Sequence, residues 1–119
     1  MNYREDLKKM EITQQPLDDC MVVVVDGQLT ADAAGEFKRI LSQIVSEHKQ
    51  LVLDLERMNY IDSTGLGALI YLFQLVSDCG GSLKLAALQA KPRIVFEITR
   101  AYKILDIYDS VDAVRAGRR

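Results

Sequence analysis

A serine and a threonine stand between an aspartate and two glycines near the middle of the chain. The segment is IDSTGLG, residues 61–67, and it follows the apolar run LVLDL at residues 51–55. Hydroxyl and carboxylate oxygens accept the first unpaired N–H groups of a helix, so one interpretation is that Asp62, Ser63 and Thr64 only cap the next helix. The second is that Ser63 accepts a phosphate, which would meet the positive helix end. Because that phosphate would lie beside the Asp62 carboxylate, it would change the surface sharply, as a switch requires.

The two glycines favour the second interpretation. Gly65 and Gly67 each weaken the first helical turn by roughly 1 kcal/mol relative to alanine, which a segment built only for stability would avoid. They also leave the backbone approachable, so a large partner can come close to the Ser63 hydroxyl. We therefore expect an exposed partner-binding surface at the helix start, made of Asp62, Ser63, Thr64, Gly65, Leu66, Gly67 and Ala68.

An enzymatic site is not supported by the sequence. A nucleophilic serine needs a base, and His48, the only histidine, falls at the end of another expected helix. No Gly-x-Ser-x-Gly elbow is present, and the two glycines lack the third glycine and the lysine of phosphate-cradling loops. Cys20 and Cys79 have neither CxxC spacing nor a histidine cluster, which favours buried thiols over metal ligands or a disulfide. We predict no catalysis, cofactor or metal.

Length and composition indicate one ordinary globular domain. The 119 residues are 49% hydrophobic and 27% charged, and the net charge of −2 argues against nucleic acid as a direct partner. The first nine residues lack the apolar stretch of a signal peptide, and the longest apolar run, residues 66–76, is too short to span a bilayer. We expect a cytoplasmic protein with no membrane partner. Its parts would be a flexible arm at 1–9, a domain at 10–116 and a basic tail at 117–119.

Strands and helices alternate along the chain. Apolar runs predict strands near 10–15, 20–25, 51–55, 82–87 and 104–108, with Asp26-Gly27 ending the second. Helical spacing predicts helices near 31–48, 66–76, 91–101 and 111–114, the third with an inward stripe of Ile94, Val95 and Ile98. The fold class is therefore α/β, with a mixed four- to five-stranded sheet, about four helices and a hairpin at the start. Ser63 would follow the carboxyl end of a strand, where sites of α/β sheets gather.

The strand and motif together resemble a known family. VLDL at residues 52–55 followed by IDSTGLG is similar to the signature of STAS domains, the anti-sigma factor antagonists, and the resemblance covers roughly residues 10–116. It implies that the serine after the aspartate, Ser63, is the phosphorylation site. It also implies partner switching, in which the unphosphorylated form captures a serine-kinase anti-sigma factor of the histidine-kinase-like ATPase fold. Phosphorylation by that kinase releases the antagonist, and a metal-dependent serine phosphatase resets it.

Two positions and one alternative stay open. Family members often carry an acidic residue after Gly-x-Leu, where this chain has Thr30, which bears on kinase identity and phosphorylation rate. Thr64 is a second hydroxyl beside Ser63 and a candidate second phosphosite. The alternative function is a non-switching STAS scaffold subunit of a transport or lipid-trafficking complex, which would be indifferent to Ser63.

Overall fold

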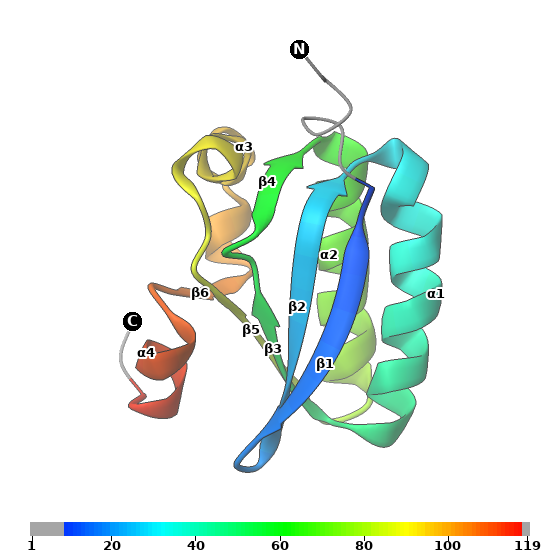
Figure 1. Ribbon diagram of the computed structural model, residues 1–119, viewed down its shortest axis with the longest axis vertical. Helices are drawn as coiled ribbons and strands as arrows, with labels where there is room; N and C mark the ends of the chain where they lie inside the picture. The colour runs from blue at the N-terminus through cyan, green and yellow to red at the C-terminus, as the bar shows by residue number, and fades with distance from the viewer. Residues whose placement is uncertain (1–8, 118–119) are drawn as a thin grey trace.

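Six strands form one mixed sheet within residues 9–117, the part of the chain that the computed structural model describes (Figure 1). The strands are β1 (Glu11–Leu17), β2 (Cys20–Leu29), β3 (Gln50–Asp54), β4 (Met58–Ile61), β5 (Ser82–Ala86) and β6 (Asp106–Tyr108). The helices are α1 (Ala31–Glu47), α2 (Ser63–Asp78), α3 (Ala90–Thr99) and α4 (Val111–Arg115), with a 3-10 turn, η1, at Ala101–Lys103. The α/β class is confirmed. The expected arm at 1–9 and tail at 117–119 lie mostly outside the described residues.

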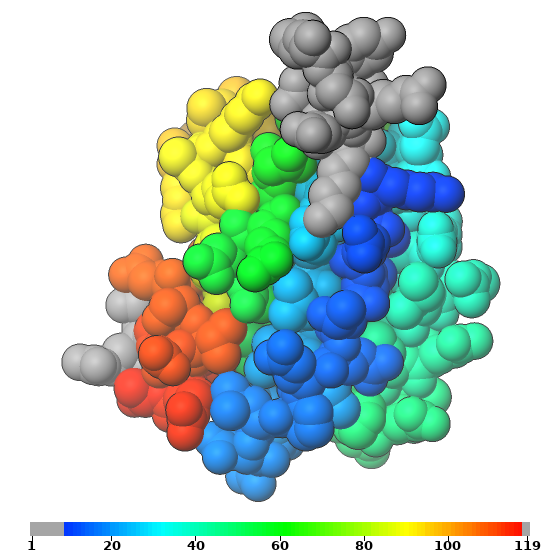
Figure 2. Space-filling model, viewed as in Figure 1, coloured from blue at the N-terminus to red at the C-terminus, as the bar shows by residue number. Residues whose placement is uncertain are grey.

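The sheet has the order β1-β2-β3-β5-β6, and only the β1–β2 pair is antiparallel, which confirms the expected hairpin. Helices α1 and α2 cover one face, and the short α4 lies on the other (Figure 1). At the end of the molecule where β2 finishes, the atoms of β4 (green) lie beside those of α3 (yellow) in Figure 2. The sheet is thus positioned so that several helices meet its upper end.

One strand was missed by the sequence pattern. Strand β4 lies between the strand predicted near 51–55 and the helix predicted near 66–76, where no element was predicted, because four residues are too few to show a periodic signal. It pairs in parallel with the end of β2, which continues past Gly27 to Leu29. Gly27 has φ 111° and donates its N–H to the Arg57 carbonyl at 3.0 Å, so the chain bulges there without ending the strand. The sheet therefore has one strand more than predicted.

The core has two parts, one on each face of the sheet. The larger packs the sheet against α1, α2 and α3, and its fully buried side chains include Phe37, Leu41, Leu53, Leu69, Leu72 and Phe96. The smaller lies under α4 and consists of Val22, Val52 and Ala86 with Val111 and Val114 against them. Strand β3 is thus covered on both faces, as its nearly continuous apolar sequence predicts.

The predicted inward face of α3 was wrong for Ile94 and Ile98, whereas Val95, the third residue of the predicted stripe, is partly buried against the core. Helix α3 buries Pro92 and Phe96, whereas Ile94 and Ile98 are 55% and 77% exposed. The helix is apolar on two sides, and spacing alone does not say which side the sheet will take. Burying the larger phenylalanine removes more apolar surface from water, so tertiary packing selected its side.

This orientation predicts unequal effects of truncation on the two sides of α3. We expect Phe96→Ala to lower the free energy of unfolding by about 3–5 kcal/mol, because it leaves a cavity in the core. Ile98→Ala should change it by less than about 0.5 kcal/mol, because the side chain is mostly in water. Urea unfolding of both variants measures this, and a larger loss from Ile98→Ala than from Phe96→Ala would contradict the packing.

Candidate functional site

Two helices begin side by side at the upper end of the sheet. Strands β2 and β4 run in parallel with Leu29 opposite Ile61, so they end at the same level, and α1 and α2 start immediately after them. Their partly positive N-termini therefore meet at one place. As expected, Ser63 follows the carboxyl end of a strand, although that strand is β4 and not the predicted strand at 51–55.

A single carboxylate caps both helices. Asp62 is the N-cap of α2, and its Oδ1 accepts the N–H of Gly65 at 2.8 Å. Its Oδ2 accepts the N–H of Ala31, the first residue of α1, at 3.0 Å. Thr30 occupies the N-cap position of α1, but its side chain makes no capping hydrogen bond. The Asp62 side chain therefore caps α1 in place of the Thr30 side chain.

The capping interpretation thus applies to Asp62, and it gives no capping role to the hydroxyl groups of Ser63 and Thr64. Ser63 and Thr64 are the first two residues of α2, and both are exposed. Because the Asp62 side chain already serves as the cap, the fold does not need either hydroxyl for that purpose. Both hydroxyl groups are open to a modifying enzyme.

The two glycines have different roles. A Cβ at Gly65 would lie 1.9 Å from the Leu29 carbonyl oxygen, so glycine there lets the start of α2 lie directly against the end of β2. Gly65 is buried and cannot be approached by a partner, contrary to its expected role. Gly67 is exposed, and a Cβ there would meet nothing within 4 Å. Only Gly67 leaves the backbone open.

The expected exposed surface at residues 62–68 is therefore smaller than predicted. Leu66 and Ala68 are buried in the core at 4% and 0% exposure, so neither offers a side chain to a partner. Asp62 is partly exposed, and Ser63, Thr64 and Gly67 are exposed. The accessible part is a narrow strip along the first turn of α2.

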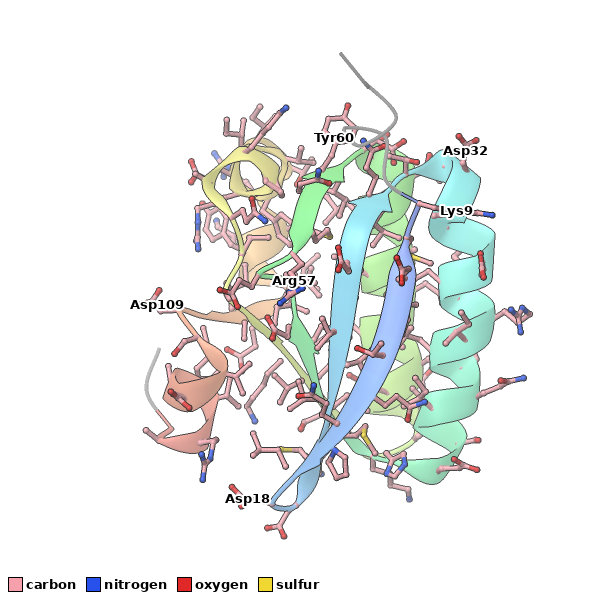
Figure 3. All side chains as sticks on the ribbon, in the orientation of Figure 1. Lys9, Asp18, Asp32, Arg57, Tyr60 and Asp109 are labelled. Atoms are coloured by element: carbon pink, nitrogen blue, oxygen red, sulfur yellow. The ribbon has the colours of Figure 1, made fainter. Side chains whose placement is uncertain are left out.

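Sequence reasoning missed an aromatic neighbour of this strip. Tyr60, in β4, is 43% exposed, and the Lys91 Nζ lies 5.8 Å from its ring centroid. In Figure 3 it lies at the same end of the molecule as Asp32, in the first turn of α1. The sequence signal that could have identified Tyr60 was its position two residues before Asp62. A second exposed tyrosine, Tyr71, lies farther along α2, with the Lys38 Nζ 5.0 Å from its ring centroid.

Ser63 has no histidine base near it. His48 is the C-cap of α1, at the opposite end of this 17-residue helix from the site, and so is roughly 25 Å away along the helix axis. Within residues 9–117 no group of three or more histidine, cysteine, aspartate or glutamate side chains could hold a metal ion. The expectation of two buried thiols was wrong for Cys79, which is exposed, while Cys20 is partly buried and neither forms a disulfide.

The fold and the site define a small α/β domain that presents an exposed serine at two converging helix starts. The STAS domain family model matches residues 10–114, and the chain belongs to this family. Its relatives include the anti-sigma-B factor antagonist of Bacillus subtilis, 32% identical over 107 residues that cover 90% of this chain and 92% of the relative. Anti-sigma factor antagonists of this family are regulators and not enzymes.

Solved structures share the fold. An anti-sigma factor antagonist from Mycobacterium paratuberculosis superposes with a TM-score of 0.83 at 19% identity, over 92% of this chain and 93% of that one. The Bacillus cell fate determinant SpoIIAA in its phosphorylated form has a TM-score of 0.67 at 16% identity, over 92% and 100%. Among residues 9–117 of this chain, no helix combines the length and the hydropathy needed to cross a membrane.

The double cap predicts an unusually large effect of one side chain on stability. Asp62→Ala removes the acceptor of two helix starts, so we expect a loss of about 2–4 kcal/mol in the free energy of unfolding. The control is Ser110→Ala, because Ser110 caps only α4, through the Ala113 N–H at 2.9 Å. Its loss should be about 1 kcal/mol. Equal losses in thermal or urea unfolding would mean that the bond from Ala31 adds nothing.

Proposed function

We propose that this chain is an anti-sigma factor antagonist that acts by partner switching through Ser63. While Ser63 is unphosphorylated, the chain binds a serine-kinase anti-sigma factor of the histidine-kinase-like ATPase fold. The kinase then phosphorylates Ser63 and is released, and a metal-dependent serine phosphatase restores the binding form. The proposal places this cycle in the cytoplasm. The observation that carries it is that Asp62 caps both helices and leaves the Ser63 hydroxyl exposed.

The charge at the site explains how a phosphate would act as a switch. A phosphate on Ser63 adds about −1.5 to −2 charges at neutral pH. The converging N-termini of α1 and α2 accommodate this charge, so the fold persists. The Asp62 carboxylate is the adjacent residue, so the surface becomes strongly negative. A partner that must desolvate both anions then binds much more weakly.

The names of the relatives support this function over a transport scaffold. The Bacillus subtilis relative, which aligns with 90% of this chain, is named as an anti-sigma factor antagonist. SpoIIAA, which shares the fold, has been obtained in a phosphorylated form. A scaffold subunit would bind its complex irrespective of the state of Ser63, and this difference separates the two functions experimentally.

Phosphate transfer tests the assigned acceptor. Purified wild type, Ser63→Ala and Thr64→Ala are each incubated with a lysate of the native host and labelled ATP. We expect label on wild type and Thr64→Ala and none on Ser63→Ala, because Ser63 is the proposed acceptor. Equal labelling of wild type and Ser63→Ala would place the acceptor elsewhere. Loss of label only in Thr64→Ala would identify the neighbouring hydroxyl as the acceptor.

A glycine pair tests whether the partner approaches the backbone of α2. Gly67→Ala and Gly35→Ala both replace exposed helical glycines with nothing within 4 Å of the added Cβ. Each should raise the free energy of unfolding by about 0.5–1 kcal/mol. Only Gly67→Ala should also weaken kinase binding, by about 1–3 kcal/mol, because its methyl group enters the interface. Calorimetric titration measures this, and unchanged affinity for Gly67→Ala would show that the partner does not contact that turn closely.

A further inference from the structure

A cleft of about 520 Å³ lies at the end of the sheet opposite Ser63. It is bounded by the β1–β2 turn, the starts of β3 and β5, and the C-terminal end of α4. Strands β3 and β5 run parallel to β2, so their starts lie far from the end of β2 and from Ser63. Figure 3 shows this separation, with Asp18 of the turn and Tyr60 of β4 at opposite ends. The volume is within the range of about 300–1,000 Å³ that is typical of small-molecule pockets.

The floor of the cleft belongs to the face of the sheet that α4 covers. The strand register places Val22, Val52 and Lys84 side by side on this face, in β2, β3 and β5. Val22 and Val52 are buried in the smaller part of the core, whereas Lys84 is half-buried and lines the cleft. A lysine in such a row buries its aliphatic stem against its apolar neighbours and presents its ammonium group to the cleft.

Lys84 has no counter-ion in the part of the chain that the structure describes. Among residues 9–117 its side chain makes neither a hydrogen bond nor an ion pair. Asp18 and Asp19 line the same cleft, but both are exposed, and Asp18 pairs with Arg115 of α4, with 3.2 Å between its Oδ2 and the arginine Nε. A charge that is partly removed from water is stabilised by a group of opposite charge. The cleft therefore contains a positive charge that an anion can neutralise.

The uncharged groups of the cleft supply a hydrogen-bond donor and apolar contacts. The Ser82 hydroxyl donates to the side-chain oxygen of Gln50, so the amide nitrogen of Gln50 remains a donor for a further acceptor. Val52 and Val114 line the cleft from the sheet and from α4. A cation and an amide donor beside apolar side chains are the lining that an anionic head with a small apolar body requires.

We propose that this cleft binds a small organic anion whose carboxylate or phosphate head pairs with the Lys84 ammonium group. The Gln50 amide donates a second hydrogen bond to the head, and the apolar body of the anion rests against Val52 and Val114. This inference does not rest on the proposed function. Because the cleft and Ser63 lie at opposite ends of the sheet, a bound anion leaves the Ser63 hydroxyl accessible.

The test is a titration of the nitrogen-15-labelled full chain, followed by amide NMR shifts in a buffer without carboxylate or phosphate. The probes are benzoate and phenyl phosphate, with neutral benzyl alcohol and cationic benzylamine as controls. We expect saturable shifts at residues 50–52 and 82–84, with a Kd of about 1 mM for at least one anion. Both controls should bind at least about fivefold more weakly, because they lack the negative charge. Tighter binding of benzoate or of phenyl phosphate identifies which head the cleft prefers.

Variants of Lys84 assign the binding to its charge. Lys84→Met keeps most of the aliphatic stem and should weaken binding of the anion at least about fivefold, whereas Lys84→Arg keeps the charge and should retain most of the affinity. The matched control is Lys103→Met, because Lys103 is an exposed lysine of η1 outside the cleft, and it should leave the affinity unchanged.

Three results would overturn the inference. The first is the absence of saturable shifts with either anion up to about 20 mM in the wild type, which needs no variant to fold. The second is saturable shifts that map outside the cleft. The third is equal affinity of the wild type and Lys84→Met. None of these results bears on phosphate transfer to Ser63, so the proposed function is tested separately.

Discussion

The hydrogen bonds of the Asp62 carboxylate fix the relation between α1 and α2, and the site depends on that relation. One oxygen receives the amide of Ala31 and the other that of Gly65, so the two helices share one cap. The absence of a side chain at Gly65 lets the turn rest against the Leu29 carbonyl. Both helices pack on the same face of the sheet, so this junction also sets how the larger core is closed.

The junction places the structural role of Asp62 directly beside the proposed regulatory role of Ser63. Asp62 is committed to the fold through its hydrogen bonds, while the neighbouring Ser63 is exposed. A modification of Ser63 can therefore change the charge of the surface without removing the cap. The converging helix N-termini offset part of the added negative charge inside this domain, but a partner surface has no such compensation. The same phosphate is thus tolerated by the fold and disfavoured by the proposed complex.

Local patterns predicted the features that depend on near neighbours in sequence. The apolar run of β3, the β1–β2 hairpin and the helix after Ser63 follow from composition and spacing. The short β4 and the double role of Asp62 did not, because both depend on β2 and β4 ending together. The outer side of α3 was misassigned because two apolar sides compete for the sheet, and only packing decides that Phe96 is buried. Motif spacing placed Ser63 near a helix start, as the structure has it, but only the structure shows that Gly65 is needed for packing.

The measurement that tests the central claim most directly is the affinity of the purified kinase for the chain with and without phosphate on Ser63. The two forms are prepared from one batch, separated by ion exchange and titrated under identical conditions. The account predicts at least about 100-fold weaker binding of the phosphorylated form, equivalent to about 2.7 kcal/mol, with both forms equally folded by circular dichroism. Equal affinity of the two forms would contradict partner switching through Ser63.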